Sequence, residues 1–198
     1  MIQPTLFPVD NPDALDYWPT PAWCTELLLP HLPIGAVFLE PCAGNGAIAR
    51  VLTRAAGCEQ VWCSDPHEQP DRCEAGAHGV SLWWLRRPVD ATYPDDLERL
   101  FEAALPTTMH RGCIVSNPPY SLAFDVVRAC VASGLPTWML LRLAFLESQE
   151  RAPWLRQHPP RVLVLSRRPS FSADGKSDSS AYAWFGWNVD GAGTIGWL

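Results

Sequence analysis

The chain has 198 residues, of which 47% are hydrophobic and 11% aromatic, enough apolar material for the core of one domain. Its formal net charge is −6, which excludes a protein that binds nucleic acid through a general excess of positive charge. The seven cysteines form an odd number without a C-x-x-C pair, which argues against a disulfide framework and fits a reducing compartment.

The sequence predicts a cytoplasmic protein with no membrane partner and no metal. The first residues lack the basic start and apolar stretch of a secretory signal. The longest apolar run, 138–146, contains Arg142 and is too short to span a bilayer. Cysteines and histidines do gather in one region, but their spacing matches no familiar zinc pattern. These residues are Cys58, Cys63, His67, Cys73 and His78.

The N-terminal part of the chain predicts an arm followed by a helix. Residues 1–16 are rich in Pro and Asp and are expected to form a loose arm, with residues 17–198 forming a single domain. Thr20 suits the N-cap of a helix whose first position is Pro21. The buried face of this helix is expected to consist of Leu27, Leu28, Leu29 and Leu32.

A strand, a glycine turn and a helix follow, which is the order of a mononucleotide-binding unit. The strand covers 36–39 and the helix 47–56. In the turn between them, Gly44 and Gly46 allow a tight bend and close approach of backbone to a ligand. Only G-x-G is present, so the full dinucleotide fingerprint is absent.

Two acidic residues are expected at the same edge of the sheet as this turn. The second strand, 60–64, ends at Asp65, about 20 residues beyond the glycine turn, where a carboxylate can bind ribose hydroxyls. The alternative is a structural role, in which Asp65 at the end of the strand caps a turn. After a polar loop over 66–79 and a third strand over 80–84, Asp90 is expected at that edge too. A helix is expected over 94–105.

The next strand leads into the sequence Asn117-Pro118-Pro119-Tyr120, which we call the catalytic bracket. The two prolines fix their own φ angles and donate no backbone hydrogen bonds, and a residue before proline adopts extended geometry. The result is a stiff segment at the carboxyl end of a strand, where ligands of open α/β sheets bind. A helix over 122–131 is expected to follow.

The bracket suits a planar substrate that carries an amino group. The side-chain oxygen of Asn117 and the carbonyl of Pro118 can each accept a hydrogen bond from one –NH₂ group, and Tyr120 can stack on the ring that bears it. No strong base is needed, because the amine can attack first and lose its proton later. A proline-stiffened turn without function is the alternative, so the interpretation depends on a cofactor site elsewhere in the chain.

The remaining sequence predicts a fifth strand over 137–141, a sixth over 161–165 and a last strand over 181–189. The last two are joined by a loop and are therefore expected to be antiparallel neighbours. From Arg142 onward the chain carries seven basic and five acidic residues, although the whole chain is acidic. This excess favours a substrate-side surface, or simply a solvated rim.

At this point the pattern resembles the amino-directed S-adenosylmethionine-dependent DNA methyltransferases. The resemblance covers most of residues 16–190, and cofactor motifs precede the catalytic motif, as in the gamma arrangement. Four separate pieces carry the resemblance. They are Asp16-Tyr17 with Thr20-Pro21, Glu40-Pro41 with Gly44-Asn45-Gly46, Asn117-Pro118-Pro119-Tyr120, and Arg168-Pro169-Ser170-Phe171 with Tyr182-Ala183-Trp184-Phe185.

The resemblance implies a Rossmann-like class I methyltransferase fold, a seven-stranded and mostly parallel sheet with a reversed last strand and helices on both faces. It implies S-adenosylmethionine as cofactor and assigns site residues. The expected cofactor-binding residues are Tyr17, Thr20, Glu40, Pro41, Gly44, Asn45, Gly46, Asp65, Asp90 and Asn117. The expected catalytic residues are those of the bracket, and the expected substrate-binding residues are Tyr120, Arg167, Arg168 and Phe171.

The resemblance also implies an activity, transfer of a methyl group to N6 of an adenine flipped out of DNA. Asn at position 117 favours adenine over cytosine, for which Ser is more usual there. The family's usual C-terminal recognition domain is missing, as in compact phage-encoded members, so recognition depends on short loops, a partner chain or a homodimer. Two alternatives stay open: methylation of a protein glutamine amide or an RNA base, and a cofactor-binding subunit without catalytic activity.

Overall fold

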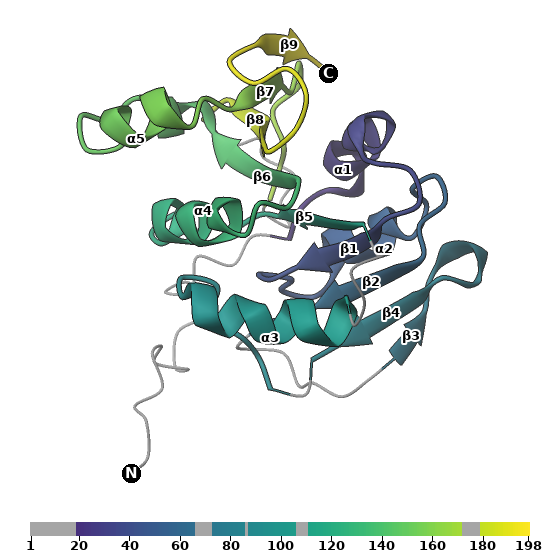
Figure 1. Ribbon diagram of the computed structural model, residues 1–198. Coiled ribbons are helices and arrows are strands. Elements are labelled where there is room, and N and C mark those ends of the chain that lie inside the picture. The colour runs from purple at the N-terminus through teal and green to yellow at the C-terminus, as the bar shows by residue number, and fades with distance from the viewer. Residues whose placement is uncertain (1–18, 66–72, 86, 106–110, 172–178) are drawn as a thin grey trace, which may run out of the picture.

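The computed structural model describes residues 19–65, 73–85, 87–105, 111–171 and 179–198, and these form one mixed sheet with helices on both faces (Figure 1). The strand order is β3-β4-β2-β1-β5-β6-β8-β7-β9. The strands are β1 (Val37–Glu40), β2 (Gln60–Cys63), β3 (Cys73–Ala75), β4 (Ser81–Trp84), β5 (Gly112–Ser116), β6 (Thr137–Arg142), β7 (Arg161–Val164), β8 (Tyr182–Trp187) and β9 (Ile195–Trp197).

The helices enclose two separate hydrophobic cores. Residues of α1 and α2 pack on one face of the sheet, and residues of α3 and α4 pack on the other. This arrangement confirms the prediction of helices on both faces. The α-helices are α1 (Ala22–Leu28), α2 (Ala47–Leu52), α3 (Pro94–Ala104), α4 (Ala123–Ala132) and α5 (Ala152–Gln157), and the 3₁₀ helices are η2 (Leu29–His31), η3 (Ala77–Gly79) and η4 (Leu143–Leu146).

The parallel strands bring their carboxyl ends to one edge of the sheet. Strands β4, β2, β1, β5 and β6 all run in the same direction, with registers such as Glu40 opposite Cys63 and Ser116 opposite Met139. Because neighbouring strands lie about 5 Å apart, the residues that follow these strand ends are close in space. We call this edge the carboxyl edge.

All seven predicted strands are present, but the sheet has two more. Strand β3 lies in the segment 66–79 that was predicted to be a loop, and pairs antiparallel with β4. Strand β9 is a further strand that follows the one predicted to be last, and it pairs parallel with β7. The strand that was predicted to be last, 181–189, is β8, and it runs antiparallel to both β6 and β7, so the prediction that it is reversed is confirmed.

Three local predictions near the N-terminal half need correction. The N-cap of α1 is Pro21 and has no side-chain cap, so Thr20 is not the cap residue. Leu27 is exposed, because it lies on the outer side of α1, whereas Leu28 and Leu32 are buried as predicted. Helix α2 ends at Leu52, because the backbone turns after Thr53 toward Gly57, which has a φ of +65°.

Helix α1 is fixed to the far half of the chain by a buried hydrogen bond. The indole Nε1 of Trp184, in β8, donates to the carbonyl oxygen of Cys24, in α1, at 2.8 Å. Both residues are fully buried. The position of α1, and of Thr20 just before it, therefore depends on the C-terminal strand β8.

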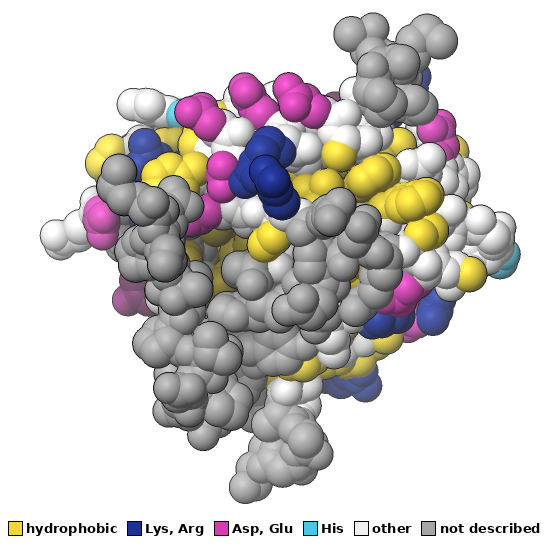
Figure 2. Space-filling model, turned by 90° about the horizontal axis from the view of Figure 1, so that it is seen from below, with side chains coloured by type: hydrophobic (Ala, Val, Ile, Leu, Met, Phe, Trp, Pro, Cys, Tyr) yellow, Lys and Arg dark blue, Asp and Glu magenta, His cyan; other side chains and the backbone are white. Residues whose placement is uncertain are grey.

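One face of the protein carries both acidic and hydrophobic side chains. Figure 2 shows one face on which acidic side chains gather along a margin and hydrophobic atoms reach the surface beside them. None of the helices in the described ranges could span a membrane, and no group of three or more metal-binding side chains occurs in those ranges. The arm 1–16, Tyr17, His67 and Lys176 lie outside the described residues.

Candidate active site

The glycine turn between β1 and α2 is bonded to the end of β2. Gly44 and Gly46 both have left-handed backbone, with φ of +51° and +79°. The amide of Gly44 donates to Oδ2 of Asp65 at 2.7 Å, and the amide of Ala43 donates to the carbonyl of Ser64 at 2.9 Å. The structure therefore brings Asp65 and the glycine turn together, as the sequence predicted, with the carboxylate on a backbone amide of the turn.

Gly46 is packed so closely against neighbouring side chains that a residue with a Cβ would not fit there without a shift. A Cβ at this position would lie 3.0 Å from Cζ2 of Trp84 and 3.4 Å from Nη1 of Arg50. Gly46 is buried and begins α2, whereas its neighbour Asn45 is exposed and uses its carbonyl to accept a hydrogen bond from Arg50. The turn is thus a narrow backbone cradle next to the indole of Trp84.

Glu40 ends β1 beneath this cradle and is almost fully buried, with 1% exposure. Its Oε2 has no hydrogen-bond partner among the described residues. Burial raises the pKa of the carboxyl well above its usual range, the nearby Asp65 adds to this, and a hydrogen bond from the Ala49 amide partly offsets it. Pro41 next to it is buried as well.

The raised pKa of Glu40 predicts a dependence of stability on pH. Above the ordinary pKa of 4.5, the unfolded chain releases a proton that the folded chain keeps, so this residue lowers the free energy of unfolding as the pH rises. Glutamine stays neutral at every pH. As the pH is raised from about 5 to about 8, we expect the melting temperature of Glu40→Gln to rise by a few degrees relative to that of the wild type. Calorimetry measures both melting temperatures.

The matched control is Glu26→Gln. Glu26 is an exposed glutamate whose Oε1 lies 2.7 Å from Nη1 of Arg54, so its substitution removes a surface ion pair and little else. Its melting temperature should follow that of the wild type across this pH range. Parallel curves for Glu40→Gln and the wild type would show that the folded chain does not hold Glu40 in its neutral form.

The catalytic bracket follows β5 and is joined to the N-terminal motif. Nδ2 of Asn117 donates to Oγ1 of Thr20 at 3.1 Å. Thr20 is buried, with 6% exposure, and lies 97 positions from Asn117 in the sequence. This contact explains why Thr20 does not cap α1: its hydroxyl accepts from the side-chain amide of Asn117 instead.

The ring of Tyr120 lies in a cluster of aromatic and cationic side chains. Cζ of Arg142 is 4.3 Å from the centroid of the Tyr120 ring, and the ring of Tyr182 is 6.1 Å away. Phe171 contacts Tyr182 edge to face, with centroids 5.0 Å apart. The structure therefore connects two predicted substrate residues, Tyr120 and Phe171, through Tyr182.

Asp90 is placed near Asp65 by the backbone. The amide of Val89 donates to Oγ of Ser64, the residue before Asp65, at 2.8 Å. Oδ1 of Asp90 accepts from the amide and the hydroxyl of Thr92, at 3.0 and 2.6 Å. Asp90 thus lies at the carboxyl edge, as predicted. Its carboxylate accepts two hydrogen bonds from Thr92 and so stabilises the turn that follows it.

The two predicted basic substrate residues lie on the loop after β7. Both Arg167 and Arg168 are exposed, and neither forms an ion pair within the described residues. The guanidinium of Arg167 lies 4.1 Å from the ring centroid of Trp23, one turn along α1 from Thr20. Stacking on an aromatic ring orients an arginine without neutralising its charge.

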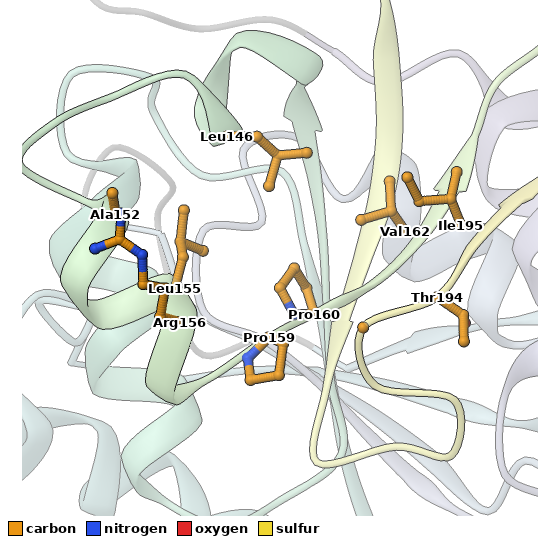
Figure 3. Close-up of a pocket in the computed structure, with 10 residues that line it drawn as sticks. Leu146, Ala152, Leu155, Arg156, Pro159, Pro160, Val162, Thr194 and Ile195 are labelled. Carbon is orange, nitrogen blue, oxygen red and sulfur yellow. The ribbon is translucent and has the colours of Figure 1, made fainter.

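A cavity of about 320 Å³ lies elsewhere, at the outer end of the sheet (Figure 3). Side chains of α5, such as Leu155, face Val162 of β7 and Ile195 of β9 across it. Arg156 is the charged residue in its lining. No predicted site residue lines this cavity, and its lining contains no carboxylate, histidine or cysteine, so we do not place chemistry there.

Sequence reasoning assigned no site role to four residues that lie beside the predicted site residues: Trp23, Trp84, Arg142 and Tyr182. Arg142 had a usable signal, because it is a charged residue at the carboxyl end of an otherwise apolar strand, like Asp65. Tyr182 becomes its neighbour only through the antiparallel pairing of β6 with β8. Trp23 and Trp84 have no signal of their own, since tryptophans in amphipathic helices and buried strands usually serve the core.

Solved structures are similar to this chain, 62 chains among them, whereas no protein-family model and no curated protein sequence matches it. A candidate class I S-adenosylmethionine-dependent methyltransferase from Listeria monocytogenes superimposes with a TM-score of 0.51 at 9% identity, over 89% of this chain and 62% of that protein. A candidate methyltransferase from Streptococcus mutans, in complex with S-adenosylhomocysteine, gives 0.45 at 12% identity, over 91% and 99%. An rRNA methylase from Streptococcus thermophilus gives 0.45 at 8%, over 92% and 99%.

The superposition on the Listeria protein concerns the fold, and the chain spans less than two thirds of that protein's length. Together with the mostly parallel sheet, the reversed strand β8 and the helices on both faces, it confirms the predicted architecture. The chain therefore has the Rossmann-like fold of class I methyltransferases.

Proposed function

We propose that this protein transfers a methyl group from S-adenosylmethionine to the N6 amine of an adenine in DNA. The hydrogen bond between Nδ2 of Asn117 and Oγ1 of Thr20 carries the proposal. A carboxamide whose –NH₂ is held by a hydroxyl presents its oxygen on the other side. Asn117 is thereby oriented as an acceptor for a substrate amine, next to the glycine cradle at the same edge.

The residues present fit S-adenosylmethionine. The left-handed turn at Gly44 and Gly46 permits close approach of a ligand to the backbone, and a Cβ at Gly46 would not fit beside Trp84 without a shift of the turn or of the ring. Asp65, which follows β2, would bind ribose hydroxyls, and Asp90 would bind the adenine amino group. Thr20 and the glycine turn would hold the methionine end. When bound, this cofactor supplies an electrophilic methyl carbon.

The bracket residues then position the acceptor. Asn117 and the Pro118 carbonyl each accept one hydrogen of the substrate –NH₂, which directs the nitrogen lone pair away from both. Tyr120 stacks on the ring, and such contacts contribute roughly 1–3 kcal/mol per base. This stacking offsets part of the cost of a few kcal/mol for extruding the base from a duplex. Transfer would leave S-adenosylhomocysteine as the second product, and the methylated amine then passes its surplus proton to water, so catalysis consists mainly of positioning.

An experiment with labelled methyl groups tests the proposal. The purified chain is incubated with methyl-labelled S-adenosylmethionine and, separately, with unmodified DNA, RNA and a protein extract, and digested products are identified by mass spectrometry. N6-methyladenine in the DNA is the expected product. Label in RNA or on protein glutamine would replace the proposed acceptor, and label nowhere would favour a cofactor-binding subunit without catalytic activity.

Arg167 and Arg168 are expected to contact phosphates rather than to read bases. They are exposed cations near the bracket, and phosphate contacts position DNA without sequence information. Replacing both with alanine should weaken methylation of all DNA sequences about equally. The slope of log affinity against log salt should become shallower by about 0.9 for each lost contact. DNA binding measured at several salt concentrations checks this result.

Arg54→Ala is the matched control for the double variant. Arg54 is also an exposed arginine, but Glu26 neutralises it at 2.7 Å on the side of α1 and α2. Its replacement should leave the salt dependence unchanged. A strict preference for one sequence lost in the Arg167/Arg168 variant would show base readout by this loop instead.

A further inference from the structure

The side chain of Arg142 lies directly against the ring of Tyr120. Arg142 is the last residue of β6, at the carboxyl edge, and β6 pairs with the strand that leads into the bracket. Its Cζ is 4.3 Å from the Tyr120 ring centroid, within the distance at which a guanidinium is attracted to an aromatic face. An aromatic ring has two faces, and here the guanidinium covers one of them.

The guanidinium is held in this place from the sheet side. Its Nε donates to Oη of Tyr182 at 3.0 Å, and the two residues are direct partners in the β6–β8 ladder. Tyr182 is fully buried, and Phe171 packs against its ring. A half-buried arginine bonded to a buried tyrosine keeps a fixed geometry, so its contact with Tyr120 is not that of a freely moving surface side chain.

We propose that Arg142 is a positioning residue for Tyr120: it fixes the plane of the ring against which a planar base would stack. This role rests on the proposed function, because it assigns the substrate side of Tyr120. A ring that is fixed before the base arrives loses less conformational freedom on stacking. A fixed ring also keeps the plane of the stacked base in a constant position relative to Asn117, three residues earlier in the bracket.

A double-mutant cycle tests the proposal. Arg142→Met and Tyr120→Leu are compared with the double variant in two assays: binding of a short oligodeoxyadenylate in the presence of S-adenosylhomocysteine, and single-turnover methyl transfer to DNA. Arg142→Met should lower oligonucleotide affinity and transfer rate about tenfold in the wild-type background and change neither in the Tyr120→Leu background. Arg142→Lys should recover part of the loss, because an ammonium can also lie over the ring.

Arg161→Met is the matched control. Arg161 also lies over an aromatic ring, with Cζ 6.0 Å from the centroid of Trp138, but Trp138 lies near the opposite end of β6. This variant should match the wild type in both assays. A purely structural role for Arg142 would lower its melting temperature without coupling to Tyr120 in oligonucleotide binding, and that result would overturn the proposal.

Two further outcomes would also overturn it. Tighter oligonucleotide binding by Arg142→Met would mean that the guanidinium occupies the place of the base, and no binding by the wild type would mean that no base stacks on Tyr120. Coupling in binding without methyl transfer to any acceptor would refute the proposed function and leave the role of Arg142 intact. Methyl transfer without coupling between Arg142 and Tyr120 would support the proposed function and refute the role of Arg142.

Discussion

Replacing Asn117 with alanine is expected to lower the rate of methyl transfer about a hundredfold or more, while cofactor affinity stays close to that of the wild type. The variant loses one of the two acceptors for the substrate amine, and removing one preorganised polar partner of a reacting group commonly has an effect of this size. The glycine cradle and Asp65 are untouched. Label incorporation measures transfer, and calorimetry measures binding of S-adenosylhomocysteine.

Two companion variants make this result specific. Thr20→Val keeps Asn117 but removes the hydroxyl that accepts from its Nδ2, so it should act in the same direction with a smaller effect. Asn188→Ala is the control: its Nδ2 donates to the carbonyls of Val131 and Leu135 near the opposite edge of the sheet. It should alter stability and leave transfer intact. Near-normal transfer by Asn117→Ala would remove Asn117 from the mechanism.

The second large effect is expected from Gly46→Val, which should abolish measurable binding of S-adenosylhomocysteine. Its Cβ would lie 3.0 Å from Trp84 and 3.4 Å from Arg50, so the glycine turn proposed to bind the cofactor, or the Trp84 ring, would have to shift. The φ of +79° adds strain, because left-handed backbone costs a residue with a Cβ about 1–2 kcal/mol. Calorimetry on the folded variant, verified by circular dichroism, gives the measurement.

Gly134→Val separates strain from obstruction. Gly134 has a φ of +76°, close to that of Gly46, but a Cβ there would meet no atom within 4 Å. Both variants therefore carry a similar backbone cost, and only Gly46→Val also clashes with the ring of Trp84. If Gly46→Val folds and binds the cofactor as well as Gly134→Val does, the cofactor site lies elsewhere.

The sequence was sufficient for the elements whose signal is local. Buried strands such as Val37–Glu40 are short apolar runs bounded by glycine or proline, and the bracket is stiff because of its own prolines. The two missed strands, β3 and β9, have three residues each and are exposed at alternate positions, so no apolar run marks them. They exist because a neighbouring strand offers backbone partners, which a single sequence does not display.

The missed parts of the site have the same origin. The capping preference of threonine predicted that Thr20 caps α1. Its hydroxyl instead accepts a hydrogen bond from Asn117, which lies 97 positions away in the sequence. Arg142 and Tyr182 meet only because β8 runs antiparallel to β6. Local propensity located the functional segments, whereas the contacts that orient their side chains depend on the pairing of distant strands.

The buried bond between Trp184 and Cys24 has a consequence for how the molecule acquires its structure. It joins residues 160 positions apart, and it holds α1, which follows Thr20. Contacts between such distant residues slow folding, because a long loop must close before they form. During synthesis, this bond therefore cannot form until β8 has left the ribosome. A chain truncated before β8 lacks the bond and is expected to hold α1, and with it Thr20, less firmly.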